Sequence, residues 1–431
     1  MKNKIYSLIA ASGIFLISCE KDPETVYETI TVTETVVVTE TVTVEVPTTT
    51  VPETETVGGG GIFFIDDSQV WTNDRIWIMD GKVVVRDGGV LTIQPGTIVK
   101  ATSGQGVDAT ALVIAKGGTL FADGTASEPI VFTDIADELS YSNTNRISPN
   151  RVFTDTGKWG GVIMLGQATV GEDGGEDTIE GIATGYEWTK YGGSLDADSS
   201  GSLDYVSIRH SGTQLGNGDE IQGLTLGGVG SGTNVTNVEI VGSDDDGIEI
   251  FGGTVNVTNL TIWGQRDDAI DLDEGYSGTI DNAAVNMKAG GDTVFEIDGT
   301  EDGTDVLDGQ FTVKNVTYIG VAGNTEKTTQ LGDWKSGASG TMENILYTVM
   351  DGQAFKGIHS NYDATATENA KNVLIFKNFE FVTTTTLAAI FANTTDVTGS
   401  APAWASIVST PTVGADTSVM SWTWWYQETQ Q

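Results

Sequence analysis

A short pattern that recurs through the C-terminal part of the chain constrains its fold more than any other feature. Val235-Thr236-Asn237-Val238-Glu239-Ile240 aligns with Val257-Thr258-Asn259-Leu260-Thr261-Ile262, 22 residues later. A base period of about 22 residues suits a parallel β-helix, because each coil supplies about three short strands and equivalent positions stack at roughly 4.8 Å. Since no long segment shows an apolar period of 3.6 residues, we expect an all-β solenoid. The pattern returns at 280–283, 313–316, 342–345 and 370–373, centred on Asn282, Asn315, Asn344 and Asn372.

The recurring asparagine has a structural explanation in such a fold. Its amide can donate a hydrogen bond to the same asparagine of the next coil and accept one from the coil on its other side. The repeat therefore predicts an internal ladder that satisfies buried polar groups. Further upstream, Gly88-Gly89-Val90-Leu91 and Gly117-Gly118-Thr119-Leu120 repeat one turn-and-strand unit. We place the solenoid, with caps at both ends, over residues 62–431.

The N-terminus has the features of a lipoprotein signal. Residues 1–18 combine Lys2 and Lys4 with an apolar run that is too short to span a membrane, as in a signal peptide. The run closes on Leu16-Ile17-Ser18-Cys19, which resembles a bacterial lipobox, and Cys19 is the one cysteine of the chain. We expect Cys19 to carry the lipid that anchors the protein to the membrane. The alternative is a cleaved signal with an incidental cysteine.

Residues 19–61 form a low-complexity segment rich in Thr, Val and Glu. Between 24 and 57 it holds no Lys or Arg and too few large apolar groups for a core. We interpret it as a stalk that ends at the run Gly58 to Gly61. A competing hypothesis is that its alternating valines pair with a second copy of the chain.

The composition excludes several classes of function. With 60 acidic against 21 basic residues, the net charge is −39, which opposes binding to nucleic acid. One cysteine permits neither a disulfide scaffold nor a cysteine-based zinc site, and two histidines leave little room for histidine-based metal chemistry.

Four motifs carry a resemblance to a known family. They are Thr92 to Lys100, Trp159 to Ile163, Leu203 to Ile208 and Phe251 to Asn256. Through them the sequence is similar to Bacteroidetes surface lipoproteins with a right-handed parallel β-helix of the pectate-lyase-like type, over roughly residues 70–430. The resemblance implies fold and location, an outer-membrane lipoprotein facing the cell exterior, and no established activity. Glu20-Lys21-Asp22 after Cys19 also resembles the export tag of such proteins.

The ends of a solenoid need protection, because exposed strand edges aggregate. We expect the segment around Trp71 and Trp77 to form the N-terminal cap. The C-terminal aromatic sequence Trp422-Thr423-Trp424-Trp425 is the candidate cap at the other end.

Acidic turns repeat in register with the asparagines. The alignment puts Asp246, Asp268 and Asp292 in one column. It puts Glu249, Asp271 and Glu296 in another. Carboxylates about 5 Å apart repel one another, so such columns bind cations, take up protons or remain hydrated. Calcium suits them because it takes six to eight oxygens in flexible geometry. A solvated turn rich in aspartate is the alternative.

A catalytic interpretation uses the same residues. Hydrolases of this fold class place aspartates on successive coils as acid and base, and the pairs Asp245-Asp246 and Asp267-Asp268, with Arg266 nearby, fit that pattern superficially. The Gly-His-Gly and Arg-Ile-Lys elements of polygalacturonase-like hydrolases are absent. No isolated arginine stands out as the base of a polysaccharide lyase.

Two further sites follow from local patterns. Asp196, Asp198, Ser200 and Asp204 resemble ligand positions of a calcium loop, but position twelve is Ser207 instead of glutamate, which favours a simple turn. Aromatic residues in a Gly-rich insertion could stack on a sugar or cover a coil. They are Tyr186, Trp188 and Tyr191. Arg209-His210 is expected to end a strand.

The sequence therefore predicts a lipid-anchored surface β-helix with a binding or structural role, with calcium as a candidate cofactor. Its expected partners are the membrane through Cys19 and a carbohydrate or another surface protein. A polysaccharide lyase or glycoside hydrolase that uses the stacked aspartates is the alternative.

Overall fold

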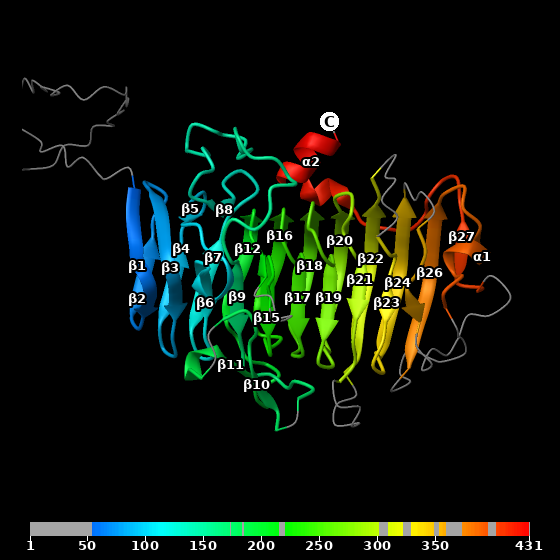
Figure 1. Cartoon of the computed structure of the whole chain (residues 1–431), viewed down its shortest axis with the longest axis horizontal. Helices are drawn as coiled ribbons and strands as arrows, with labels where there is room; N and C mark the ends of the chain where they lie inside the picture. Colours follow the sequence, from blue (N-terminus) through cyan, green and yellow to red (C-terminus); the bar gives the residue numbers. More distant parts are fainter. Residues whose placement is uncertain are drawn as a thin grey trace, which may run out of the picture. The chain divides into compact units, whose positions relative to one another are not determined.

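The computed structural model describes residues 54–430, except 173, 183–184, 215–219, 301–308, 322–328, 349–352, 359–372 and 395–401. These residues form a right-handed parallel β-helix, as predicted, whose successive coils stack along one axis (Figure 1). The signal peptide predicted over 1–18, Cys19 and residues 20–53 of the predicted stalk lie outside the described residues. In the described part of the chain, no helix has the length and apolar character needed to cross a membrane.

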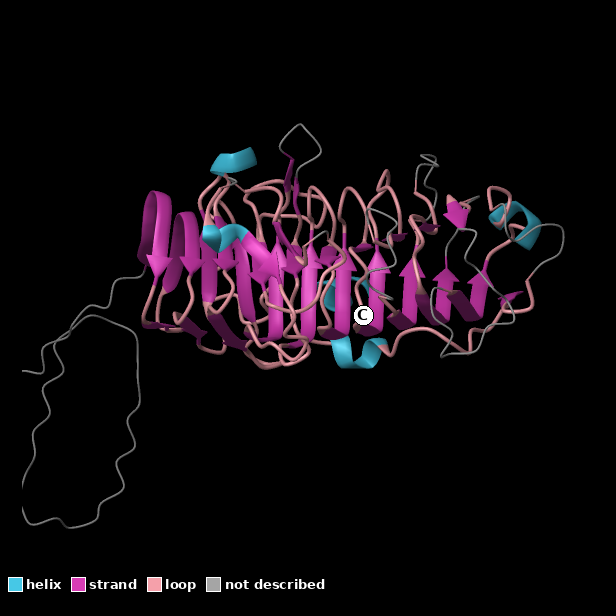
Figure 2. Cartoon of the chain, turned by 90° about the horizontal axis from the view of Figure 1, so that it is seen from below, coloured by secondary structure: helices cyan, strands magenta, loops and turns pink. Residues whose placement is uncertain are grey.

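Three parallel sheets, which we call sheets I, II and III, form the faces of each coil. A typical coil gives one long strand to sheets I and II, bent in its middle, and one short strand to sheet III (Figure 2). The long strands are β12 (Gly201–Arg209), β16 (Asn234–Val241), β18 (Asn256–Trp263), β20 (Thr279–Asn286), β22 (Phe311–Ile319), β24 (Gly340–Thr348) and β26 (Leu374–Val382).

The first coils use shorter strands for sheets I and II. Sheet I begins with β2 (Ser68–Trp71), β4 (Val90–Ile93) and β7 (Thr119–Asp123). Sheet II begins with the first halves of β1 (Thr54–Ile65) and β3 (Ile76–Val85), continues through β5 (Ile98–Ala101) and β8 (Ile130–Asp134), and ends at β27 (Ala405–Ile407).

Sheet III carries the candidate functional site on its outer side. It starts with the second halves of β1 and β3 and runs to the last coil. Its further strands are β6 (Ala111–Ile114), β9 (Val162–Leu165), β15 (Leu224–Gly227), β17 (Ile248–Phe251), β19 (Ile270–Asp273), β21 (Phe295–Ile297), β23 (Asp333–Trp334) and β25 (Gly357–Ile358).

Smaller elements decorate the coils. Two antiparallel hairpins are formed by β10 (Glu176–Thr178) with β11 (Lys190–Gly192) and by β13 (Thr213–Gln214) with β14 (Glu220–Ile221). The helical elements are α1 (Leu387–Ile390), α2 (Trp424–Thr429), and the 3₁₀ turns η1 (Gly106–Asp108), η2 (Glu187–Thr189) and η3 (Thr417–Met420).

The β-helix begins earlier than predicted. β1 starts at Thr54 and not at Ile62, because Thr54 to Gly58 pair with Ile76 to Asp80 of β3. The register shifts between Gly58 and Gly61, so the glycine run is an irregularity within a strand and does not end a stalk. Gly58 and Gly81 need to be glycine, since both have positive φ and a Cβ on either would lie 2.2 Å from a backbone oxygen of the other strand.

One continuous apolar core fills the inside of the coils. Side chains alternate along each strand, so every second residue points inward, as Ile248 and Ile250 do in β17. Parallel register then stacks like on like, for example Val238 on Leu260 and Leu260 on Ala283. Burial of each aliphatic side chain contributes about 1.5–3 kcal/mol to the free energy of folding, and this burial holds successive coils together.

The asparagine ladder is confirmed in its hydrogen bonds except at one step, where Asn315 donates to Oδ1 of Asp281 and not to Asn282, and it lies on the outer surface. Asn259 donates to Asn237 over 2.9 Å, and Asn282 donates to Asn259 over 2.7 Å. These residues sit at the bend between sheets I and II with φ of 52–65°, a conformation that asparagine tolerates better than most residues. The bend turns their side chains outward, and most are partly exposed instead of internal.

The last ladder position differs from the prediction. Asn378 and not Asn372 follows Asn344, because Glu343 pairs with Lys377 and Ile345 with Phe379. Asn378 donates to Asn344 over 3.1 Å. Asn372 itself lies outside the described residues.

The C-terminal aromatic sequence does not cap the last coil. Residues 410–430, here called the C-terminal strap, run back along sheet II, and α2 lies beside the middle coils (Figure 1). The backbone N–H of Trp425 donates to Oε1 of the buried Glu239, and Trp425 packs in a cluster with Val241 and Trp263. The end of the solenoid is instead covered near α1, where Trp404 packs on Phe376, Phe379 and Phe391. At the other end, Trp71 and Trp77 stack 5.3 Å apart in the first coils.

Candidate functional site

A column of carboxylates runs along the outer side of sheet III. The strand register places Thr225, Glu249, Asp271, Glu296 and Asp333 side by side on five successive coils. Each lies between residues that point into the core, which is why all five face outward. The second predicted column is therefore confirmed in its register.

The first predicted column needs one correction. Asp246 and Asp268 are in register, and the Asp268 N–H donates to Oδ1 of Asp246 over 2.8 Å. The third member is Thr293, whose N–H contacts Oδ1 of Asp268, whereas the Asp292 N–H donates to the Asp267 carbonyl. The extra residue of that coil falls before Asp292, so Asp292 shifts by one position into the neighbouring column.

The two columns converge into one cluster of buried carboxylates. One oxygen each of Asp246, Glu249 and Asp271 lies within 4.8 Å of the others, and the same holds for Asp268, Asp271 and Glu296. Asp246, Glu249, Asp268 and Asp271 are at most 8% exposed. We call these four residues, together with Glu296, the sheet III cluster.

Two oxygens of this cluster have no hydrogen-bond partner among the described residues. They are Oε2 of Glu249 and Oδ1 of Asp271, and both are inaccessible to solvent. A buried polar atom without a partner costs about 1–3 kcal/mol, and more if it is charged. Both oxygens are therefore free to coordinate a bound group.

Burial and mutual repulsion govern the protonation of the cluster. Burial, followed by repulsion from Asp246, raises the pKa of Asp268 to about 11. Burial and repulsion from Asp271 likewise raise the pKa of Glu249 well above its ordinary value. Glu296 is the exception: burial opposes its ionisation, but hydrogen bonds from Asp268 and Lys335 hold its pKa at about 2.

Two lysines border the cluster, and the sequence interpretation missed both. Lys335 Nζ lies 2.9 Å from Glu296 and 3.0 Å from Asp298, while Lys356 lies 3.6 Å from Glu296 and 3.3 Å from Asp333. Both lysines are about 40% exposed (38% and 41%). Extending the column register from Glu296 by two coils would have found them.

The paired aspartates proposed for catalysis lie at one end of the cluster. Asp245 is buried and hydrogen-bonded to Asp267, and burial followed by repulsion from Glu220 raises the pKa of Asp245 to about 9. Oxygens of Asp246, Asp267 and Asp268 lie within 4.8 Å of one another. Arg266 is turned toward Asp244, donating to its carbonyl over 2.8 Å, and its guanidinium is 3.9 Å from Asp267.

The residues of the predicted calcium loop hold separate groups. Asp196 accepts from Thr169, Asp198 accepts from the Gln167 N–H, and Asp204 accepts from Asn237 at the start of the ladder. Among the described residues, none of these aspartates belongs to a set of three carboxylates with oxygens within 4.8 Å. The Ser200 N–H donates to Thr233. The structure does not bring the four predicted residues to a common point.

The three aromatic residues of the insertion take different positions. Tyr191 is buried, with 1% exposure, and packs on Phe251 of sheet III. Trp188 is 7% exposed and stacks with Tyr186, which is the exposed member of the set. Only Tyr186 offers a ring face to solvent.

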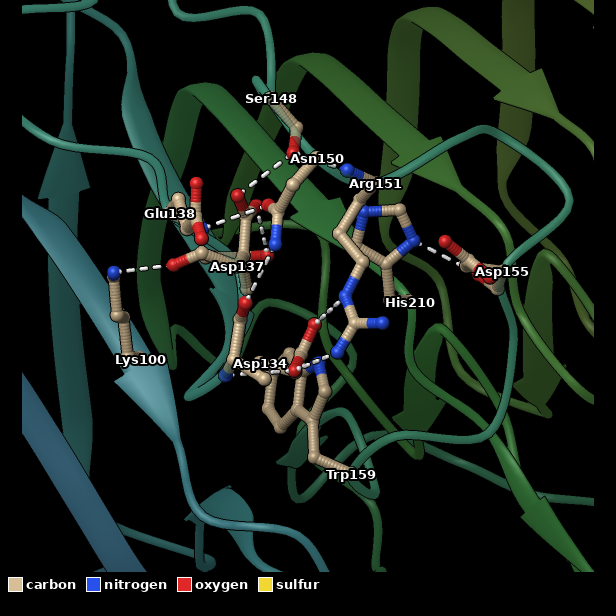
Figure 3. A network of polar contacts seen from close by, with 12 residues as sticks. Lys100, Asp134, Asp137, Glu138, Ser148, Asn150, Arg151, Asp155, Trp159 and His210 are labelled. Atoms are coloured by element: carbon tan, nitrogen blue, oxygen red, sulfur yellow. Dashed lines mark hydrogen bonds and ion pairs between the residues drawn. The ribbon is translucent and has the colours of Figure 1, made fainter.

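Arg209 and His210 belong to the scaffold. β12 ends at Arg209, as predicted, and the guanidinium stacks over Trp424 of the strap at 5.0 Å. His210 is fully buried and bonds the Asp155 carbonyl through Nδ1, and burial lowers its pKa. Figure 3 shows the surrounding network, in which Asp134 and Arg151 pair at 2.6 Å below His210 and Asp155.

The sheet III cluster fits a hard divalent cation such as calcium. It offers only oxygen ligands from several coils, and Oε2 of Glu249 and Oδ1 of Asp271 are left uncommitted by the described residues. A bound cation would also keep ionised the carboxylates that burial otherwise protonates.

The fold and these residues can be compared with known proteins. The family model described as pectate-lyase like beta helix domain matches residues 64–427. The chain belongs to this family.

Solved structures to which this chain is similar include two of the pectin methylesterase from Aspergillus niger, in penultimately deglycosylated and deglycosylated forms. The first shares 11% identity over 82% of this chain and 87% of the other, with a TM-score of 0.29. The second shares 12% identity over 74% of this chain and 88% of the other, with a TM-score of 0.28. No curated protein sequence matches the chain.

Proposed function

We propose that this family member is a lipid-anchored surface protein that binds its ligand non-catalytically on sheet III through a divalent cation, calcium being the best candidate. The observation that carries the proposal is the sheet III cluster with its unpartnered oxygens on Glu249 and Asp271. Repulsion between these carboxylates is relieved when a cation lies among them. Anchoring through Cys19, at the outer face of the outer membrane, rests on the lipobox and on the resemblance to surface lipoproteins.

A glycan is the ligand class that the rim of the cluster favours. Calcium takes six to eight oxygens, so a cation held by three or four carboxylate oxygens keeps positions for water or ligand hydroxyls. Glu296, Lys335 and Lys356 supply hydrogen-bonding groups that reach solvent beside the cluster. Glu249 and Asp271 are 6% and 8% exposed, so they are placed to hold the cation from below and not to contact the ligand themselves.

A glycan array tests the proposal with calcium and with chelator. We expect calcium-dependent binding by the purified protein and its loss in the double variant Glu249→Gln/Asp271→Asn. Asp196→Asn is the matched control, since it removes an acidic group outside the cluster. Absence of binding to every glycan with calcium present would contradict the glycan ligand, and a surface protein would then be the partner to seek.

The anchor is tested separately. Cells that express the protein and are fed labelled palmitate should incorporate label, and Cys19→Ala should abolish it and release the protein from membranes. Surface exposure is checked by protease treatment of intact cells. Label in the Cys19→Ala variant would contradict the assigned attachment point.

One observation supports glycoside hydrolysis as a second candidate. Asp268 and Glu296 face each other with their pKa values moved in opposite directions, to about 11 and about 2. Such a pair can serve as a proton donor and an ionised partner, as in glycosidases. New reducing ends released from a polysaccharide, and their loss in Glu296→Gln, would favour this function. No product from a panel of polymers would exclude it for those substrates.

A further inference from the structure

A second cleft lies beside sheet III, under the hairpin of β10 and β11. It has a volume of about 260 Å³. Tyr191 and Phe251 give it an aromatic wall, and Glu172, Asp177 and Glu274 bring three carboxylates into it. One oxygen of each carboxylate lies within 4.8 Å of the others. Glu274 comes from the turn after β19, whereas Asp177 belongs to the hairpin, so the cleft joins two separate parts of the chain (Figure 1).

Glu274 is the fixed member of this group. It is 4% exposed, and the Gly171 N–H donates to its backbone carbonyl over 2.9 Å. Its Oε1 accepts a hydrogen bond from the Tyr191 hydroxyl. Its Oε2 is buried and has no hydrogen-bond partner among the described residues, and it belongs to a side chain that lines the cleft. One oxygen is therefore held by the protein and the other is available to a ligand.

The charge around the cleft also points to a cation. Four of its described lining residues are acidic, Glu180 being the fourth, and none of them is lysine or arginine. The nearby basic residues are used elsewhere, since Lys116 pairs with Glu176 and Lys190 with Glu187.

We propose that this cleft is a second divalent-cation site, which clamps the hairpin of β10 and β11 onto sheet III. Glu274 supplies the anchoring ligand from the β-helix, and Glu172 and Asp177 supply ligands from the hairpin segment. Calcium fits because the donors are carboxylate oxygens on two segments and the geometry is irregular. The ion holds the hairpin, with Tyr191 of β11, against Phe251 of β17, and its removal lets the hairpin open. This site shares no ligand with the sheet III cluster and is independent of the proposed ligand binding.

Limited proteolysis of the purified protein measures the clamp. Trypsin cleaves after lysine, and Lys190 in β11 reports on opening of the hairpin. We expect calcium at ten times its dissociation constant to slow cleavage after Lys190 about tenfold relative to chelator. In Glu274→Gln this protection should disappear, whereas Glu249→Gln/Asp271→Asn should retain it.

Terbium luminescence gives a second readout that does not depend on the protease. A Tb³⁺ ion in the cleft lies close to Tyr191, whose excitation should sensitise its emission. Glu274→Gln should remove this signal while keeping the melting temperature of the chelated protein, because an amide oxygen can still accept from Tyr191. Unchanged calcium protection and unchanged luminescence in Glu274→Gln would overturn the proposal, as would loss of both signals in the sheet III double variant alone.

Discussion

Two columns of stacked polar residues run along the same solenoid, and they solve the same problem in different ways. In the asparagine ladder each amide is both donor and acceptor, so Asn282, Asn259 and Asn237 satisfy one another from coil to coil. In the sheet III column, Glu249 and Asp271 stack with the same spacing, but ionised carboxylates only accept. The first column is complete without a ligand, whereas the second needs protons or a cation.

The largest expected difference is in the pH dependence of the calcium-free protein. The pKa of Asp245 is raised to about 9 and that of Asp268 to about 11, both above their values in the unfolded chain. The folded state then binds more protons than the unfolded state, so stability is full below about pH 4 for these groups and falls as pH rises. We expect a loss of about 3 kcal/mol or more between pH 5 and 9 in denaturant melts.

Calcium should suppress this pH dependence, because a bound cation takes the place of the protons. A flat profile without calcium would mean that the carboxylates are hydrated and unstrained. The ladder predicts no such dependence, since its amides do not titrate.

Replacing one asparagine of the ladder by a carboxylate should destabilise the protein, because an ionised carboxylate accepts hydrogen bonds but cannot donate one. Asn259→Asp keeps an acceptor for Asn282 but loses the donor to Asn237, at a cost of about 1–3 kcal/mol at neutral pH. The loss should shrink in acid, where a protonated carboxyl can donate again. Asn259→Gly is the control for backbone effects, because it retains the positive φ. A pH-independent loss would show that the ladder bonds are not its cause.

Neutralising one carboxylate of sheet III should instead raise the free energy of unfolding. In calcium-free protein, Glu249→Gln removes a repelling group from the column, and we expect stabilisation by about 1 kcal/mol near pH 8. Calcium should then stabilise the variant less than the wild type. Destabilisation without calcium, measured by the same melts, would indicate that Glu249 is already satisfied.

The smallest effect is expected at the end of the ladder. Asn378 is exposed and donates to Asn344, so Asn378→Gly, which keeps the positive φ without strain, should cost less than about 1 kcal/mol. Asn259→Gly, at an interior rung, is the matched comparison and should cost more. Equal losses would mean that ladder bonds do not depend on their neighbours.

The strongest parts of the fold were predictable because the repeat is local. Val235 to Ile240 and Val257 to Ile262 fix the register of two coils, and the alignment then gave Glu249, Asp271 and Glu296 correctly. An insertion of uncertain position breaks this reasoning. The coil after Asp268 is longer than the one before it, and nothing in the sequence shows that its insertion lies entirely before Asp292. For that reason Thr293, and not Asp292, follows Asp246 and Asp268 in the first column.

Features that depend on contacts between distant segments were not predictable. The strap returns to Glu239, 186 residues before Trp425, and no periodicity records that contact. Glu274 was not recognised as a site residue, because its partner segment around Asp177 lies in an irregular insertion. Lys335 and Lys356 could have been found, since they follow from the register of Glu296 with Asp333 and Asp333 with Gly357.

A calcium titration by calorimetry tests the central claim most directly. The purified protein should bind calcium, and Glu249→Gln/Asp271→Asn should lose the sites of the sheet III cluster while keeping the site under the hairpin. Asn259→Asp should leave all calcium binding unchanged. Calcium binding that is absent in the wild type, or identical in the double variant, would contradict the account.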